Sequence, residues 1–177
     1  IFAYGNEEQR KKYMPKLASG EWMGCFGLTE PNHGSNPGGM ETKFKDMGDH
    51  YLLNGAKLWI SNSPFADVAV VWAKNEEGRI HGLIVERGME GFSTPETHNK
   101  WSLRASATGE LIFDNVKVPK ENLIGEEGKG FYYLMNGLQL ERLIFVPSCV
   151  GAMEFAISES INYMKQRKSF GQSIDKF

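Results

Sequence analysis

The sequence predicts an α+β protein in which a mostly antiparallel β-barrel or sandwich lies between two helical segments. Short β-branched and aromatic runs, separated by Gly, Asn and Pro turn signals, fill residues 21–124. Helical patterns occupy residues 1–20 and 125–177. The chain has 177 residues, 41% of them hydrophobic, which is enough to bury a core. We therefore expect three parts with these boundaries.

The first part carries the start signal of a short helix. Asn6 is followed three residues later by Gln9, the spacing of a capping box. The helix should end near Gly20, and Pro15 should kink it or end it earlier.

The second part contains six strand candidates with turn residues between them. A two-residue Asn54-Gly55 sequence inside one of them is typical of a type I′ β-hairpin. The candidates are WMGCFGL, METKFKD, HYLLNGAKLWIS, ADVAVVWAK, RIHGLIVE and TGELIFDNVKV.

The third part is predicted to be helical from Phe131 to Lys168, with a kink or break at Pro147. Glu141 lies inside an apolar stretch of this helix. Its neighbours three and four residues away are Gly137, Leu138, Ile144 and Phe145, so its carboxylate shares a face with apolar groups. A charged side chain is unfavourable in apolar surroundings, so its presence at this position calls for a structural or functional explanation.

Composition excludes several classes of function. Twenty Lys and Arg balance 22 Asp and Glu without a like-charge block, which argues against nucleic-acid binding and an anionic membrane surface. No apolar run is long enough to span a bilayer.

Cys25 and Cys149 have no metal-ligand spacing and indicate structural roles in a reducing compartment. The chain begins at Ile1 and ends within a helical pattern, so we expect a fragment of a longer protein.

Familiar catalytic motifs are absent. There is no GxSxG or HExxH sequence, and the four histidines lack metal-ligand spacing, so no metal site is expected. The Gly-rich loop at residues 27–39 is either a backbone nest for an anion or electron-rich ring, formed by Gly34, Gly38 and Gly39, or a plain surface connection. Trp59 is likewise either a cofactor platform or a core aromatic residue.

Four segments resemble the acyl-CoA dehydrogenase family, in the order in which that family has them. They are GLTEPNHGSN, LNGAKLWISNS, DNVKVPKENLIG and YMKQRKSFG. The resemblance covers the whole chain. It implies the end of an N-terminal helical domain (1–20), a flavin-binding middle β-domain (21–124) and the start of a C-terminal helical domain (125–177). It also implies FAD as cofactor and α,β-dehydrogenation of an acyl-CoA thioester.

By position, the resemblance implies a set of flavin-binding residues. Thr29 matches a residue that hydrogen-bonds the pyrimidine end of the flavin, and Trp59 matches the aromatic residue packed against it. Ser61 stands where the family usually has Thr, and Asn36 where Asp is usual. The full set in the middle domain is Phe26, Leu28, Thr29, Gly34, Ser35, Trp59, Ile60 and Ser61.

The resemblance extends to a neighbouring subunit. Arg167 and Phe170 match residues that reach the FAD of another protomer, which implies a homo-oligomer, usually a tetramer. Without the resemblance, Arg167 is a solvated charge and Phe170 a core residue. The family also implies an electron-transfer flavoprotein as partner, and a location in the mitochondrial matrix of a eukaryote or the cytoplasm of a bacterium.

The catalytic base is the point on which the resemblance divides. The middle part is closer to glutaryl-type enzymes, whereas LQLERLIF is closer to isovaleryl and long-chain types, whose catalytic glutamate matches Glu141. The alternatives are a base in a later segment, or buried structural salt links from Glu141 and Arg142 to other helices, since adjacent residues on a helix do not face each other. Positions expected to contact CoA are Ser35, Tyr132, Gln139 and Arg142.

Two further functions stay open at this stage. One is a noncatalytic β-domain that acts as a binding module, and the other is an acyl-CoA oxidase. The acyl-chain specificity cannot be read from the sequence, because in this family the pocket is built largely outside these residues.

Overall fold

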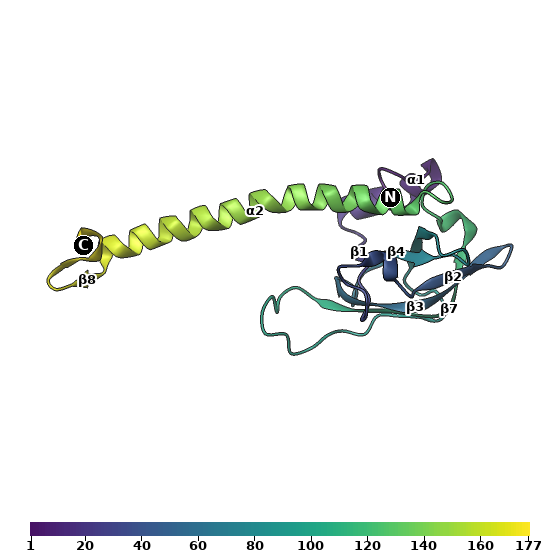
Figure 1. The fold of residues 1–177 in the computed structure, drawn as a ribbon, viewed down its shortest axis with the longest axis horizontal. Coiled ribbons are helices and arrows are strands. Elements are labelled where there is room, and N and C mark those ends of the chain that lie inside the picture. Colours follow the sequence, from purple (N-terminus) through teal and green to yellow (C-terminus); the bar gives the residue numbers. More distant parts are fainter. The chain divides into compact units, whose positions relative to one another are not determined.

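The computed structural model describes all residues, 1–177. It divides into two compact units, Ile1–Leu134 and Met135–Phe177, which are described in turn. The first unit combines helix α1 with a curled β-sheet (Figure 1). The second consists of most of a long helix, α2, and a short β-hairpin.

Helix α1 (Glu7–Ser19) begins and ends where the sequence predicts. The Asn6 side chain accepts a hydrogen bond from the Gln9 N–H, and the Gln9 side chain accepts one from the Asn6 N–H, which completes the capping box. Gly20 ends the helix with φ +76°. Pro15 lies inside the helix and does not end it early.

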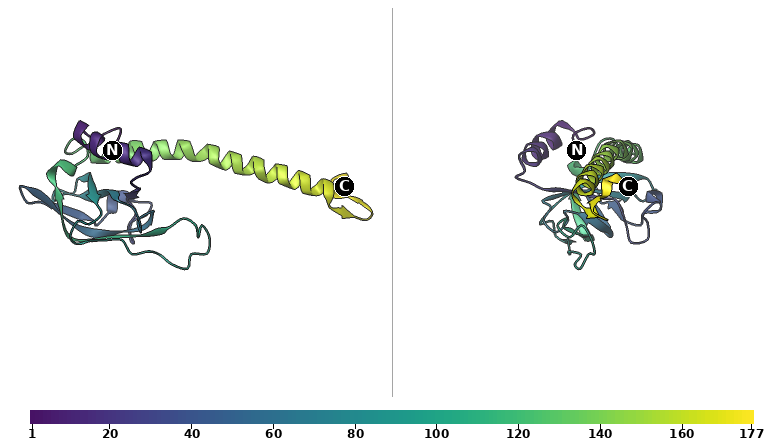
Figure 2. Two further views of the ribbon diagram at one scale, coloured as in Figure 1. Left: turned by 180° about the vertical axis from the view of Figure 1, so that it is seen from behind. Right: turned by 90° about the vertical axis from the view of Figure 1, so that its left-hand side faces the viewer.

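Helix α1 is attached to the sheet by polar contacts that support a small apolar cluster. The buried Tyr13 donates its hydroxyl to Glu86 Oε1 at 2.7 Å, and Gln9 Nε2 donates to the Glu121 and Leu123 carbonyls. Two further views show α1 beside the sheet (Figure 2). Burial and the Glu86 carboxylate raise the pKa of Tyr13 to about 12, so its hydroxyl stays a donor at neutral pH.

Seven strands form the sheet of the first unit in the order β1-β4-β2-β3-β7-β6, with β5 paired to β4. Every strand candidate from the sequence is a strand, and β6 is an additional one. Their bounds are β1 (Gly24–Gly27), β2 (Lys43–Asp46), β3 (His50–Ser61), β4 (Val68–Lys74), β5 (Ile80–Glu86), β6 (Phe92–Ser93) and β7 (Thr108–Pro119). Two 3-10 helices, η1 (Pro37–Gly39) and η2 (Lys120–Asn122), lie in the connections.

The pairing is mostly antiparallel, as expected, but β1 pairs with β4 in parallel. The curled sheet encloses one main core. Its fully buried members include Leu53, Val71, Leu83, Leu111 and Val116. The predicted α+β fold class is confirmed.

The predicted hairpin at Asn54-Gly55 is wrong. Both residues lie inside the continuous strand β3, where the register against β7 shifts between Leu53 and Gly55. Asn54 accepts a hydrogen bond from the Asn115 N–H on β7, so its side chain joins the sheet at this bulge. Gly55 has φ +138°, and a Cβ there would lie 2.6 Å from the Thr42 hydroxyl oxygen. The Asn-Gly pair therefore marks a close approach of β2 rather than a turn.

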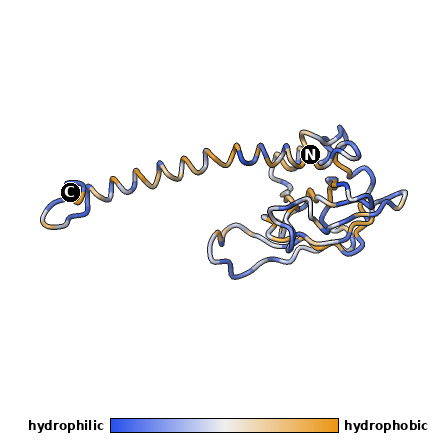
Figure 3. Tube along the Cα trace, in the orientation of Figure 1, coloured by the Kyte–Doolittle hydropathy of each residue, from blue (hydrophilic) through white to orange (hydrophobic).

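Helix α2 (Gly130–Gln166) is continuous through Pro147, so the predicted break is absent. After it, β8 (Lys168–Ser169) pairs with β9 (Gln172–Ser173), and η3 (Ile174–Lys176) ends the chain. Apolar residues recur along all of α2 (Figure 3). In the second unit they are exposed: Leu140, Leu143, Ile144, Phe145, Val146, Val150, Met153, Phe155, Ile157, Ile161, Tyr163 and Met164. None of the helices has the combination of length and apolar character that crossing a membrane requires.

Candidate flavin and acyl-CoA site

Two segments predicted to form one site meet in the first unit. The Leu58 N–H of β3 donates to the Thr29 carbonyl at 2.9 Å, just beyond the end of β1. Leu28 and Thr29 therefore lie beside the part of β3 that carries Trp59. Phe26, on β1, is 45% exposed.

Trp59 has an unusual backbone and an exposed side chain. Its φ is +62°, a conformation that a bulky residue rarely adopts, and its side chain is 58% exposed. The β3–β7 register shifts between Lys57 and Ile60, which accounts for the local bend. The alternative that Trp59 is a core residue is wrong for this chain. Strain of this kind persists where surrounding structure enforces it, often at functional sites.

The residues that follow Trp59 have opposite environments. Ile60 is buried in the core cluster at 3% exposure, so only its backbone is available to a ligand. Ser61 is exposed and pairs with Thr108 of β7. The end of β3 thus presents an aromatic ring and a hydroxyl two positions apart, on either side of the buried Ile60.

Of the two alternatives for the Gly-rich loop, the backbone nest is not formed. None of Gly34, Gly38 and Gly39 has a positive φ, which a nest of alternating handedness requires. A Cβ on Gly39 would lie 2.4 Å from the His33 imidazole, so this glycine serves close packing. Gly34 and Ser35 are exposed, and Gly34 has open space where a Cβ would be.

A buried ion pair beneath this loop was missed by sequence reasoning. Lys57 Nζ lies 2.8 Å from Glu30 Oε1, and the two side chains are 0% and 3% exposed. A sequence signal existed, because Lys57 has the same parity along β3 as the buried residues Tyr51 and Leu53.

The surroundings of this pair shift both of its pKa values. Burial raises the pKa of the Glu30 carboxyl, but the Glu41 N–H, the Lys57 ammonium and Thr42 outweigh burial and hold that pKa below its usual value. Burial also lowers the pKa of Lys57, and Glu30 opposes part of that shift.

The predicted base and, apart from Ser35, the predicted CoA-contacting residues lie on α2. Glu141 is exposed on the helix and borders a shallow hollow of about 430 Å³, lined otherwise by Gly137, Leu140, Ile144, Phe145 and Ser148. The apolar face inferred for Glu141 is therefore present, but this chain does not bury the carboxylate. Tyr132, Gln139 and Arg142 are exposed as well.

The residues expected to reach another subunit lie at the end of the second unit. Arg167 is exposed, and Phe170 is 95% exposed with φ +49°. The Phe170 ring lies edge-on to the ring of Phe177, with 6.1 Å between the ring centroids. Phe170 is therefore not a core residue of this chain.

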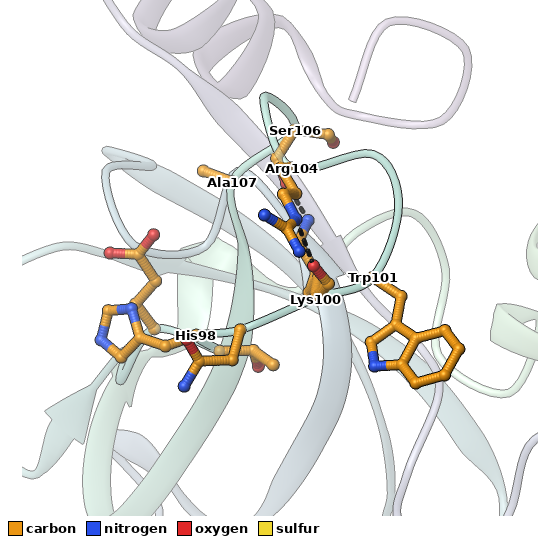
Figure 4. Close-up of a pocket in the computed structure, with 9 residues that line it drawn as sticks. His98, Lys100, Trp101, Arg104, Ser106 and Ala107 are labelled. Carbon is orange, nitrogen blue, oxygen red and sulfur yellow. Dashed lines mark hydrogen bonds between the residues drawn. The ribbon is translucent and has the colours of Figure 1, made fainter.

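A separate cavity of about 330 Å³ lies in the loop between β6 and β7 (Figure 4). Lys100 Nζ organises this loop through bonds to the Leu103 carbonyl and the Thr108 hydroxyl, each 2.9 Å. Trp101 points away from the other labelled side chains and is 97% exposed. None of the predicted site residues lines this cavity.

The chain combines a curled β-domain that carries an exposed aromatic residue with a long helix whose apolar side chains are exposed. Family models described as "Acyl-CoA dehydrogenase, middle domain" and "Acyl-CoA dehydrogenase, C-terminal domain" match residues 25–116 and 128–177. The chain belongs to the acyl-CoA dehydrogenase family, which confirms the resemblance inferred from the sequence.

Individual relatives cover both branches suggested by the sequence. The mitochondrial isovaleryl-CoA dehydrogenase of Pongo abelii is 46% identical over 98% of this chain and 42% of its own length. The structure of a glutaryl-CoA dehydrogenase from Mycobacterium smegmatis in complex with FADH2 is 40% identical, with a TM-score of 0.95 over 100% of this chain and 45% of that one. A glutaryl-coenzyme A dehydrogenase glutaryl-CoA complex is 41% identical, with a TM-score of 0.94 over 100% and 46%. The chain spans less than half the length of these relatives.

The residues present fit a flavin. An isoalloxazine ring needs an aromatic or apolar surface and nearby hydrogen-bonding groups. Trp59 and Phe26 supply exposed aromatic surface, while Thr29 and Ser61 supply hydroxyls from the two adjoining segments. These four residues belong to one compact unit with a buried core.

Proposed function

We propose that this chain is part of an FAD-dependent acyl-CoA dehydrogenase that converts an acyl-CoA thioester to the trans-2-enoyl-CoA. The observation that carries the proposal is Trp59, a large aromatic residue held exposed by a left-handed backbone beside the Thr29 segment. A noncatalytic β-domain has no evident need for this strain.

The reaction removes a proton from Cα and a hydride from Cβ of the acyl chain, and a carbon–carbon double bond forms. FAD, when bound, supplies the oxidising power by accepting the hydride. Glu141 takes the Cα proton as general base and becomes a neutral acid. Such a base works best with its pKa raised toward neutrality in a dry site, which segments outside this chain would complete over the apolar hollow.

The remaining predicted residues bind and orient. Thr29, Ser61 and the Ile60 backbone hold the polar edge of the flavin, and Phe26, Leu28 and Trp59 contact its ring. Gly34 and Ser35 lie toward its phosphates. Tyr132, Gln139 and Arg142, with Ser35, contact CoA.

The proposal includes an assembly and an electron acceptor. Arg167 would pair with the FAD pyrophosphate of a neighbouring protomer, and Phe170 would lie near its adenine. Such a shared site requires a homo-oligomer, for which we propose a tetramer. Electrons leave to an electron-transfer flavoprotein. The location is the mitochondrial matrix in a eukaryote and the cytoplasm in a bacterium.

The test is anaerobic flavin bleaching by the full-length protein with straight-chain, branched and dicarboxylic acyl-CoAs. We expect a yellow preparation that one class of acyl-CoA bleaches, and enoyl-CoA as product by mass spectrometry. A colourless protein that binds no FAD would support a noncatalytic module instead. Fast reaction of the reduced flavin with oxygen would identify an acyl-CoA oxidase.

A further inference from the structure

The buried pair Lys57–Glu30 lies under the segments that the proposed function assigns to the flavin. Both groups are almost fully removed from water, and their charged atoms lie 2.8 Å apart. Moving two charges out of water costs more free energy than their mutual attraction returns, unless further hydrogen bonds satisfy their remaining polar atoms. Glu30 and Lys57 both make such hydrogen bonds, and the groups they bond to show which segments the pair holds in place.

The Glu30 carboxylate closes the base of the Gly-rich loop. It accepts hydrogen bonds from the Glu41 N–H at 2.6 Å and the Thr42 N–H at 3.0 Å, so one side chain joins both ends of residues 31–40. Thr42 in turn donates its hydroxyl to the Ala56 carbonyl of β3 at 3.2 Å. The loop that carries Gly34 and Ser35 is therefore tied to the sheet at its base.

Lys57, on β3, holds the segment that leads into the same loop. Its ammonium donates to the Leu28 carbonyl at 3.2 Å as well as to Glu30. Gly27 makes room for this contact, because a Cβ there would lie 3.4 Å from Lys57 Cγ and 2.7 Å from a Leu111 methyl carbon. Lys57 also precedes Trp59 by two residues on the same strand.

These contacts join three separate stretches of flavin-site residues at one point. Leu28 and Thr29 precede Glu30, Gly34 and Ser35 lie within the closed loop, and Trp59 to Ser61 follow Lys57. The backbone hydrogen bond from Leu58 to Thr29 joins the first and third stretches. Glu30 adds the loop, because its carboxylate accepts the Glu41 and Thr42 N–H groups, and its pairing with Lys57 leaves no net buried charge.

We propose that Lys57 and Glu30 are positioning residues of the flavin site, which hold the Gly-rich loop and the Trp59 segment in their binding arrangement before the cofactor arrives. The inference rests on the proposed function. A site that is already ordered loses less conformational freedom on binding, so removing the pair weakens FAD binding even where the protein stays folded. Loss of the fixed hydrogen-bonding geometry also changes the relative affinity for oxidised and reduced flavin.

The test compares Glu30→Gln and Lys57→Met in the full-length protein with Lys45→Met as the matched control. Lys45 lies on β2, is exposed, and sits 3.7 Å from Glu76. The apoprotein is titrated with FAD, and the midpoint potential of the bound flavin is measured. We expect FAD to bind at least about tenfold more weakly to each of the two variants and equally well to the control. A tenfold change in the ratio of oxidised to reduced affinity moves the potential by about 30 mV.

A readout without cofactor tests the ordering directly. Hydrogen exchange of the apoprotein should be faster across residues 28–42 in Glu30→Gln, with the Glu41 and Thr42 amides changed most. The double variant Glu30→Met/Lys57→Met avoids the unpaired buried charge that destabilises a variant lacking only one partner. We expect it to fold and still to bind FAD at least about tenfold more weakly than the unchanged protein.

The outcomes separate this inference from the proposed function. If the unchanged protein binds FAD and the folded variants bind it with the same affinity and potential, the pair is purely structural and the inference fails alone. If the unchanged full-length protein binds no FAD, both fail.

Discussion

The two units of this chain differ in where their apolar side chains lie. In the first unit, Leu53, Val71 and Leu111 are fully buried inside a curled sheet. In the second unit, Leu143, Phe145 and Phe155 are each at least 66% exposed on α2. A helix that is apolar on all sides is typical of the inside of a helical domain. The first unit therefore contains its own core, whereas residues 1–177 leave the apolar side chains of the second unit uncovered.

The largest expected effect comes from separating flavin binding, assigned to the first unit, from proton abstraction, assigned to Glu141 in the second. Glu141→Gln in the full-length protein should retain FAD, because the flavin residues of the middle domain are unchanged, and should lose substrate reduction of the flavin by about 10²- to 10⁴-fold. Stopped-flow absorbance with acyl-CoA measures this rate. Glu154→Gln, another exposed carboxylate of α2, is the control and should react normally. Normal bleaching in Glu141→Gln would place the base in a segment beyond this chain.

The same leucine truncation should have different costs in the two units. Within residues 1–177, Leu53→Ala opens a cavity in the main core and should lower the free energy of unfolding by about 2–5 kcal/mol. Leu143→Ala, at a side chain 70% exposed, should change it by no more than about 0.5 kcal/mol. Urea unfolding measures both. In the full-length protein we expect Leu143→Ala to lower the free energy of unfolding by more than it does in residues 1–177. An equally small effect there would show that Leu143 stays exposed in the full-length protein.

The two cysteines should differ in reactivity, because Cys25 lies in the first unit and is partly buried, whereas Cys149 lies in the second and is exposed. Burial raises the pKa of the Cys25 thiol to about 11, despite the opposing effect of Arg87, so at pH 8 its thiolate is about 100-fold scarcer than at the ordinary thiol pKa. Cys149 is exposed on α2. Iodoacetamide labelling of residues 1–177, followed by peptide mass spectrometry, should modify Cys149 first. Equal labelling rates would show that β1 opens readily.

The smallest effect should have opposite signs in the two units. Gly55→Ala in β3 should destabilise residues 1–177 by more than about 1 kcal/mol, because of its positive φ and the nearby Thr42. Gly151→Ala, with open space on α2, should stabilise the helix by about 0.5–1 kcal/mol. Thermal unfolding of the two variants measures the difference. A stable Gly55→Ala variant would show that β2 moves away from β3 at little cost.

Local sequence signals predicted the elements better than their connections. The capping box at Asn6, the strands and the long helix follow from patterns within a few residues, and all are present. Asn54-Gly55 was misassigned, because the same dipeptide serves a turn or a bulge and only the partner strand decides which. Pro147 is tolerated within α2 although it removes a backbone donor.

The candidate site was predicted in part. Family resemblance pointed to Trp59, but nothing local in the sequence indicated its left-handed backbone or its exposure. The three glycines of the loop suggested a nest that the backbone does not form. Lys57 and Glu30 were overlooked, because a charged residue on the inward face of a strand becomes meaningful only when its distant partner is known.

Short-range hydrogen bonding and hydrophobic periodicity act between residues close along the chain, so the helices and strands could be predicted from sequence, and four motifs identified the family and the candidate residues. The buried pair of Glu30 and Lys57, 27 positions apart, and the bulge at which Asn54 bonds Asn115 became visible only in the folded chain. Such contacts depend on which strands become neighbours and in what register. That choice is made by the burial of the whole sheet rather than by any one segment.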